Sequence, residues 1–278
     1  MSTIILNNKI VPSDNPCIRH NDRGFTLGHG LFETILVKKG ALPALDYHWH
    51  RLKTSAPIIN ITLPFSREEL ELMLIELIID NRLQDKIAGA RVTISHGESD
   101  RGILPLKTPE PNFFISVYEC TNLTNRPYSV CIVNMRKNEH SVSAKIKSIS
   151  YLDNILAKQE AISRGYDEAI SLNTASNIAD GSISNVYIVK NGRIFTPPVA
   201  DGALPGVVRS ILLSEFYALF PIIEKTLSLT ELMDADEVFL TNALMGVKPV
   251  GKVNEKEFNS FVVTNKVAEA LCRLKNYI

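Results

Sequence analysis

Apolar residues recur along the chain with two different periods, which predicts strands and helices in alternation. The run at 30–37 is rich in apolar residues, is typical of a strand and stops at a Lys-Gly turn. From about residue 46, apolar side chains instead return at the spacing of a helix. Ser66 and Glu69 then form a capping box in front of a Leu/Ile-rich helix that ends near Asn81. This alternation indicates an α/β (mixed α+β) architecture.

The alternation continues in the second half of the chain, beyond a break. The segment at 119–127 is polar and ends in a proline, which predicts a linker between a small N-terminal α/β domain at 1–118 and a larger C-terminal domain at 128–278. Asn191 and Gly192 form a two-residue hairpin signal. The other strands are expected at 91–95, 113–118, 128–133, 168–172, 185–189 and 237–241, and the other helices at 152–164, 206–220 and 260–274.

Composition and charge exclude several classes of function. The 278 residues are 45% hydrophobic and 22% charged, which is the balance of a folded globular chain. Lys+Arg 30 against Asp+Glu 30 leaves no net charge, so the chain lacks the basic excess that binding to nucleic acid requires. The longest apolar segment, at 70–79, is interrupted by two glutamates, and the first, at 4–6, is too short for a signal peptide. We therefore expect a cytoplasmic protein without a nucleic-acid or membrane partner.

The spacing of cysteine and histidine argues against a metal site. The four cysteines lie far apart and form no C-x-x-C pair, so neither a zinc site nor a redox dithiol is indicated and the thiols should be reduced. His48 and His50 are two positions apart, which suits neither one helical face nor a zinc site. No metal is predicted, and the glycine-rich nucleotide motifs and G-x-S-x-G are absent as well.

Three segments could carry chemistry, although each pattern alone is also found in ordinary structure. The loop at 203–209 runs into a helix, whose N-terminal N–H groups suit a phosphate, but many helices simply start in this way. Lys147 precedes another helix, and a lysine in a partly apolar cleft can attack a carbonyl, although most lysines are solvated surface charges. Asp180 lies on a tight turn before a strand, where its carboxylate could face a ring nitrogen.

Together, in this order, these segments resemble the fold-type IV enzymes that use pyridoxal 5′-phosphate. That group contains branched-chain aminotransferases, D-amino-acid aminotransferases and 4-amino-4-deoxychorismate lyases. The resemblance extends over residues 22–250, which is most of the chain. It rests on Asp22-Arg23-Gly24, Phe32-Glu33-Thr34, His50-Arg51-Leu52, Lys147-Ser148-x-x-Tyr151-Leu152, Asp180-Gly181 with Asn185, Leu204-Pro205-Gly206-Val207 and Thr241-Asn242-Ala243-Leu244-Met245.

The resemblance implies a two-domain fold with the cofactor in a cleft between the domains, and it implies a role for individual residues. Lys147 would form the aldimine with pyridoxal 5′-phosphate, whereas Lys145 is out of register with the motif. Arg51 would bind the cofactor phosphate through its planar guanidinium. Tyr151 would lie near the phenolic oxygen of the cofactor. Asp180 stands where the family has a glutamate that pairs with the pyridine nitrogen, so its side chain is one methylene shorter.

The rest of the implied phosphate site consists of backbone groups. The family often has a threonine where Val208 stands, so here a hydroxyl contact is lost and the backbone donor remains. The residues whose backbone would complete the phosphate site are Val207, Val208, Asn242 and Ala243.

Three local features favour the lyases within this family. The segment at 95–102 resembles their S-x-G-x-x-x-R-G loop, in which Arg101 becomes a candidate for binding a substrate carboxylate or else an ordinary surface arginine. Ile103 stands where D-amino-acid aminotransferases have a histidine, and Leu36 where branched-chain aminotransferases tend to have an arginine. The segment at 242–250 is close to the lyases' N-A-L-M-x-x-x-P-V loop, although Tyr151 also occurs in aminotransferases.

The resemblance therefore implies a homodimeric lyase that converts the small-molecule substrate 4-amino-4-deoxychorismate to 4-aminobenzoate and pyruvate, a step of folate biosynthesis. One alternative is an aminotransferase of the same fold that acts on branched-chain or other amino acids. A second alternative is a non-catalytic protein that binds pyridoxal phosphate or a metabolite. The presence of Lys147 argues against the second alternative, because binding alone needs no aldimine lysine.

Overall fold

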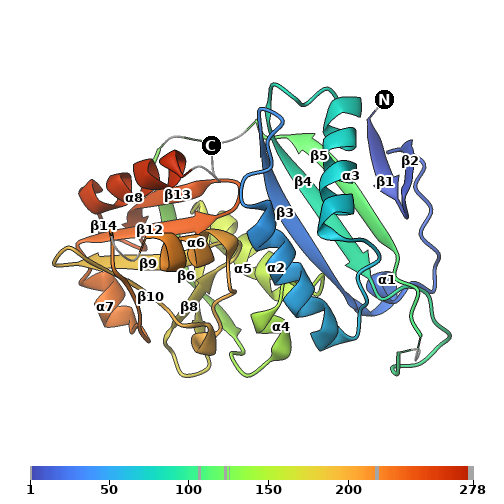
Figure 1. Ribbon diagram of the computed structural model, residues 1–278. Helices are drawn as coiled ribbons and strands as arrows, with labels where there is room; N and C mark the ends of the chain where they lie inside the picture. Colours follow the sequence, from blue (N-terminus) through green and yellow to red (C-terminus); the bar gives the residue numbers. More distant parts are fainter. Residues whose placement is uncertain (1, 106–107, 122–123, 125, 217–218, 275–278) are drawn as a thin grey trace. The chain divides into compact units, whose positions relative to one another are not determined.

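The computed structural model describes residues 2–105, 108–121, 124, 126–216 and 219–274, and its chain divides into two compact units. Unit 1 comprises Met1–Asn122 together with Lys147–Ser150, and unit 2 comprises Leu123–Ile146 together with Tyr151–Tyr277. Both units combine helices with a β-sheet (Figure 1), so the mixed α/β fold class predicted from the sequence is confirmed.

Unit 1 is built on a five-stranded sheet with the strand order β2-β1-β5-β4-β3. All of its strand pairs are antiparallel. Helices α2 and α3 pack on the sheet, α2 against β3 and α3 against β1 and β5 (Figure 1). The bounds are β1 Thr3–Leu6, β2 Lys9–Pro12, α1 Arg23–Leu27, β3 Gly30–Lys38, α2 Leu45–Ser55, η1 Ala56–Ile59, α3 Arg67–Asp80, β4 Ile87–Ser95 and β5 Phe113–Glu119.

Helix α3 forms as its sequence predicts. The Ser66 side chain accepts from the Glu69 N–H and the Glu69 side chain accepts from the Ser66 N–H, which completes the capping box. The apolar stripe of α3 consists of Leu70, Leu74, Leu77 and Ile78, and these side chains are buried in the core of the unit.

The outer edge of β3 pairs with the segment Lys147–Ser150, which explains why this segment groups with unit 1. The Phe32 N–H donates to the Lys147 carbonyl at 2.9 Å, and the Ile149 N–H donates to the Gly30 carbonyl at 3.0 Å. A Cβ atom at position 30 would lie 2.4 Å from the backbone carbonyl oxygen of Ile94, so a glycine is needed at this end of β3.

Unit 2 is built on a nine-stranded sheet with the order β11-β10-β9-β12-β13-β6-β7-β8, and β14 pairs with β13. Alternate residues of its strands face two different cores: Val130 and Ile170 lie in one, and their neighbours Cys131 and Ala169 lie in the other. The strands are β6 Tyr128–Lys137, β7 Glu168–Asn173, β8 Ile178–Gly181, β9 Asn185–Lys190, β10 Arg193–Thr196, β11 Ile222–Glu224, β12 Glu237–Asn242, β13 Gly246–Val253 and β14 Lys256–Glu257; the helices are α4 Val142–Lys145, α5 Leu152–Ser163, η2 Val199–Asp201, α6 Val207–Glu215, α7 Leu229–Met233 and α8 Val262–Arg273.

The hairpin predicted at Asn191 and Gly192 is confirmed, because this turn joins the antiparallel pair β9 and β10. Both residues have positive φ, at 51° and 72°, as a two-residue hairpin turn of type I′ requires. The helix expected at 206–220 is wrong at its end: α6 stops at Glu215, Phe216 is its C-cap, and residues 217–218 lie outside the described chain.

The four cysteines are free thiols in the structure. Among the helices of the described chain, none has the length and apolar character needed to cross a membrane.

Candidate active site

Lys147 is held in place by its backbone and lies against an aromatic ring. Its carbonyl accepts from the Phe32 N–H of β3, and its Nζ lies 4.3 Å from the centroid of the Phe32 ring. The side chain is half-buried. Lys145, at the end of the short helix α4, is exposed. Of the two lysines, only Lys147 is both anchored and partly shielded from water.

Arg51 forms a bidentate ion pair with Glu33. Its Nε donates to Oε1 at 2.8 Å and its Nη2 donates to Oε2 at 2.6 Å. Both side chains are buried, with Arg51 on α2 and Glu33 on β3. A planar guanidinium bound along this edge is fixed in orientation, with its opposite edge directed away from Glu33.

His48 completes this cluster, with its Nδ1 2.6 Å from Glu33 Oε2. Burial alone would raise the pKa of Glu33, but the Arg51 charge and the hydrogen bonds from Arg51 and His48 lower it to about 2. Burial lowers the pKa of His48, against the opposing effect of Glu33. A neutral His48 that donates from Nδ1 to an ionised Glu33 accounts for both directions.

Arg91 is a second cation next to Lys147, and sequence reasoning missed it. Its guanidinium carbon lies 3.5 Å from the centroid of the Phe32 ring, the ring that Lys147 also contacts. Arg91 pairs with Thr34 across β3 and β4, so it projects from the same face of the sheet as Phe32. The strand expected at 91–95 contained the signal, because Arg91, Thr93 and Ser95 alternate with two apolar residues and therefore share one face of the strand.

Arg101 lies in the loop that follows β4, and its side chain is exposed. The backbone of this loop is bound by the buried Arg23, which donates to the carbonyls of Gly102 at 3.1 Å and Ile103 at 2.7 Å. The loop is therefore held by a guanidinium from the D-R-G string of the sequence. The substrate role of Arg101 stays a prediction.

His96 is a fully buried histidine next to this loop. Its ring stacks on His29 with 4.3 Å between centroids, and neither ring nitrogen has a hydrogen-bond partner within the described residues. Burial, together with the nearby His29 and Arg23, lowers the pKa of His96 to about 4. The ring is therefore neutral at pH 7.

We expect His96→Leu to remove part of the acid sensitivity of the fold. A histidine whose pKa is lower in the folded chain stabilises it fully above its ordinary pKa of 6.5, and this contribution is lost as the pH falls towards 4. Over this pH range the contribution of His96 to the free energy of unfolding falls by about 3 kcal/mol. The difference in Tm between variant and wild type should therefore be larger at pH 5 than at pH 8 in thermal unfolding. The exposed His20, changed to Leu, is the matched control; an unchanged pH profile for His96→Leu would contradict the assignment.

In unit 2, the N-terminus of α6 has the properties of an anion site. The N-cap residue Gly206 has no side chain, so it does not cap the first N–H groups of the helix, which begin at Val207 and Val208. A Cβ at position 206 would lie 1.9 Å from Asn185 Oδ1, so only glycine lets the loop pack this closely. Uncapped donors and the helix dipole together suit a phosphate.

Asp180 is buried near this loop, and both of its oxygens accept hydrogen bonds. Oδ1 accepts from Asn185 Nδ2 at 3.1 Å and Oδ2 from the Leu204 N–H at 2.8 Å, while Lys137 Nζ lies 3.6 Å away. Burial raises the pKa of Asp180, and the Lys137 charge opposes this shift.

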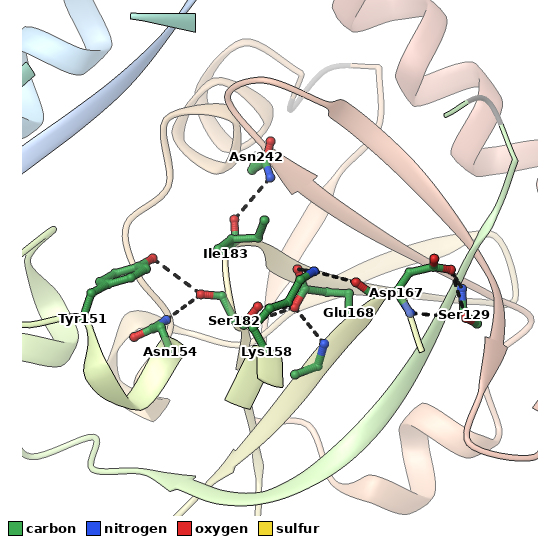
Figure 2. A network of polar contacts seen from close by, with 10 residues as sticks. Ser129, Tyr151, Asn154, Lys158, Asp167, Glu168, Ser182, Ile183 and Asn242 are labelled. Atoms are coloured by element: carbon green, nitrogen blue, oxygen red, sulfur yellow. Dashed lines mark hydrogen bonds and ion pairs between the residues drawn. The ribbon is translucent and has the colours of Figure 1, made fainter. Parts of the chain in front are cut away.

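The turn between β8 and β9 brings Tyr151 and Asn242 together (Figure 2). The Tyr151 hydroxyl donates to the Ser182 carbonyl at 3.5 Å, and Asn242 Nδ2 donates to the Ile183 carbonyl at 3.3 Å. Asn242 Oδ1 also accepts from the N–H groups two and three residues later, which closes the turn that contains Ala243. The buried Glu168 also holds the turn by accepting from the Ser182 N–H at 3.1 Å (Figure 2).

The sequence-predicted residues thus form two sets, one in each unit, and one residue, Arg101, belongs to neither set. Unit 1 carries Arg51 and Lys147, each bound to a residue of β3, with Arg101 in a separate loop. Sequence reasoning missed the buried carboxylate Glu168, because a charged residue at the start of a strand is usually solvated. No group of three or more potential metal ligands was found within the described ranges. Unit 2 carries Tyr151, Asp180, Val207, Val208, Asn242 and Ala243.

Comparison with known proteins decides the family. The family model for amino-transferase class IV matches residues 30–253. The chain belongs to this family. Its members use pyridoxal 5′-phosphate as cofactor, and the fold-type IV assignment made from the sequence is confirmed.

Individual members of the family carry different activities in their names. A Methanocaldococcus jannaschii protein, provisionally named a branched-chain-amino-acid aminotransferase, is 30% identical over 98% of this chain and 93% of its own length. The aminodeoxychorismate lyase of Bacillus subtilis is 29% identical over 92% of this chain and 88% of its own length. The crystal structure of a branched-chain aminotransferase from Thermoproteus uzoniensis with norvaline is 26% identical, with a TM-score of 0.92 over 99% of this chain and 97% of that one.

The residues present fit the cofactor of the family. Within unit 1, Lys147 offers an amine for the aldehyde carbon and Arg51 offers a guanidinium for the phosphate; within unit 2, the N-terminus of α6 offers N–H donors that suit a phosphate. Each of these groups is held by neighbouring side chains or backbone, so the units are organised for binding before any ligand arrives.

Proposed function

We propose that the chain is a pyridoxal-phosphate-dependent 4-amino-4-deoxychorismate lyase that releases 4-aminobenzoate and pyruvate. The observation that carries this proposal is the turn at 242–245, in which the lyase-like sequence N-A-L-M is closed by the Asn242 side chain. Two further residues support it: Leu36 is a buried apolar side chain where branched-chain aminotransferases tend to have an arginine, and Ile103 stands where D-amino-acid aminotransferases have a histidine.

The side chains of unit 1 suit a substrate that carries an amine and carboxylates. The amine of Lys147 lies at the Phe32 ring, and the positive charge of Arg91 at the same ring favours a carboxylate nearby. Arg101 offers a second cation from its loop. Groups that bind the substrate in this way also fix its orientation, which lowers the entropic cost of reaching the transition state.

When bound, the cofactor withdraws electron density from the substrate carbon that bears the amine. Lys147 Nζ then takes the proton from that ring carbon as a general base. The C–O bond to the enolpyruvyl group breaks, the ring becomes aromatic, and the departing enolpyruvate takes up a proton to become pyruvate. Aromatisation drives the elimination, so the side chains mainly orient the substrate and move the proton.

We expect purified protein to form 4-aminobenzoate from enzymatically generated 4-amino-4-deoxychorismate far faster than it transaminates leucine or D-alanine. The reason is that Leu36 and Ile103 leave out two polar groups that the aminotransferases have at these positions. Chromatography of 4-aminobenzoate and coupled consumption of 2-oxoglutarate measure the two activities on one preparation. Efficient transamination without detectable 4-aminobenzoate would reject the lyase in favour of the aminotransferase.

The aminotransferase remains the second candidate because one string and one residue also occur in that group, namely Phe32-Glu33-Thr34 and Tyr151. The near-equal identities of the relatives named as aminotransferase and as lyase favour neither. A non-catalytic binding protein is the third candidate, and the anchored Lys147 argues against it. A colourless protein that consumes neither substrate would support this third candidate.

The homodimer and the cytoplasmic location stay proposals that rest on the family resemblance and on the sequence. Sedimentation equilibrium of the purified chain measures the first. A monomer at all concentrations would contradict it.

A further inference from the structure

The Leu204 peptide is held from both ends by two buried side chains. Its N–H donates to Asp180 Oδ2 at 2.8 Å, and its carbonyl accepts from Asn185 Nδ2, also at 2.8 Å. Asn185 Nδ2 also donates to Asp180 Oδ1 at 3.1 Å, which locks the two side chains to each other. The two peptide groups that flank the Cα of Leu204 are thus each hydrogen-bonded, which leaves the backbone at this residue little freedom to rotate.

This peptide lies directly before the candidate phosphate site. Gly206, two residues after Leu204, is the N-cap of α6, and the donors of Val207 and Val208 follow it. The loop packs so tightly on Asn185 that no Cβ fits at position 206. A change at Asp180 is therefore transmitted to the N-terminus of α6 over two residues of tightly packed backbone.

Lys137 supplies the counter-charge for Asp180. Its Nζ lies 3.6 Å from Oδ2, and the two side chains are 17% and 5% exposed. The other cation that acts on Asp180 is the buried Arg209, whose Nη2 donates to the Pro197 carbonyl at 3.0 Å and also pairs with Glu224. Arg209 is thus already paired with other groups, so Lys137 is the cation that mainly stabilises an ionised Asp180.

We propose that Asp180 is a positioning residue for the phosphate-binding loop, that it acts through the Leu204 peptide, and that Lys137 keeps it charged for this role. The inference rests on the proposed cofactor site. It also accounts for the departure from the glutamate of the family. The aspartate side chain places its carboxylate at the Leu204 N–H. The carboxylate of a glutamate, which is one methylene longer, would extend beyond this N–H.

The test compares two probes that each lack one end of the cofactor. Pyridoxal has the ring nitrogen but no phosphate, and the 1-deaza analogue of pyridoxal phosphate has the phosphate but a C–H in place of the ring nitrogen. Dissociation constants of both probes are measured by fluorescence titration of cofactor-free protein. A residue that positions the phosphate loop affects only the probe with a phosphate, and a residue that pairs with the nitrogen affects only the probe with a nitrogen.

We expect Asp180→Asn to weaken the deaza analogue about tenfold, as loss of a charged hydrogen-bond acceptor implies, and to leave pyridoxal unchanged. Lys137→Met should give a smaller loss with the same selectivity. Lys190→Met, which removes an exposed lysine paired with Asp236, is the control and should bind both probes normally. Thermal unfolding confirms that each variant is folded.

An unchanged affinity for the deaza analogue in folded Asp180→Asn would overturn the inference. Failure of the wild-type protein to bind pyridoxal phosphate at all would instead overturn the proposed cofactor site. If Asp180→Asn is unfolded, the comparison passes to Lys137→Met, where equal affinity for the deaza analogue in variant and wild type counts against the proposal.

Discussion

Lys147→Ala should abolish turnover and the covalent attachment of pyridoxal phosphate. Loss of a general base alone costs about 10²–10⁴ in rate, and here the same side chain is also the amine that bonds to the cofactor. The phosphate donors and the Asp180 carboxylate remain in this variant, so it should still bind the cofactor non-covalently. Borohydride reduction followed by peptide mass spectrometry measures the attachment, and the absorbance of the bound cofactor should change with it.

Lys145→Ala is the matched control, because this second lysine lies two residues away and is exposed. The control should retain colour, covalent attachment and turnover. A reduced adduct on Lys145, or an active Lys147→Ala variant, would show that the register of the lysine motif is wrong.

The fold was predictable where the signals are local. The capping box of α3 and the hairpin at Asn191 and Gly192 depend on side chains within a few residues, and both formed as predicted. Other strands carried no such signal: β8 is short, with four residues, and β13 has eight residues but contains two glycines and a proline that mask its pattern. The order of the strands in both sheets depends on pairings distant in sequence, which no local pattern encodes.

In the candidate site, too, the residues with a local signal were predictable and their distant partners were not. The motif strings pointed to Lys147, Arg51 and Asp180, but not to what holds these groups. Lys147 is anchored by the edge of a strand more than a hundred residues earlier, and Asp180 by a loop peptide and a lysine from different elements. Glu33 appeared only as one letter of a string, although its carboxylate orients the guanidinium that the resemblance assigned to phosphate.

Arg51→Ala should destabilise the protein strongly and weaken cofactor binding. Removing the arginine takes away the charged partner of the buried Glu33 and leaves only the His48 hydrogen bond, and breaking such a pair costs about 3–5 kcal/mol. The pH profile should also invert. In the wild type, Glu33 has a pKa of about 2 in the folded state, so its contribution to stability is present above 4.5 and is lost as the pH falls towards 2. In the variant, burial raises the pKa of Glu33 above its unfolded value, so its contribution is present at low pH and is lost as the pH rises.

Urea unfolding across pH 4 to 8 measures this inversion, and titration with pyridoxal phosphate measures binding. The double variant Glu33→Gln with Arg51→Met separates the two effects, because it removes the buried charges together and keeps the volume. We expect it to recover most of the stability but not the cofactor affinity, since stability needs only a matched pair whereas phosphate binding needs the guanidinium. A double variant that binds the cofactor as tightly as the wild type would show that the role of Arg51 ends at its ion pair with Glu33.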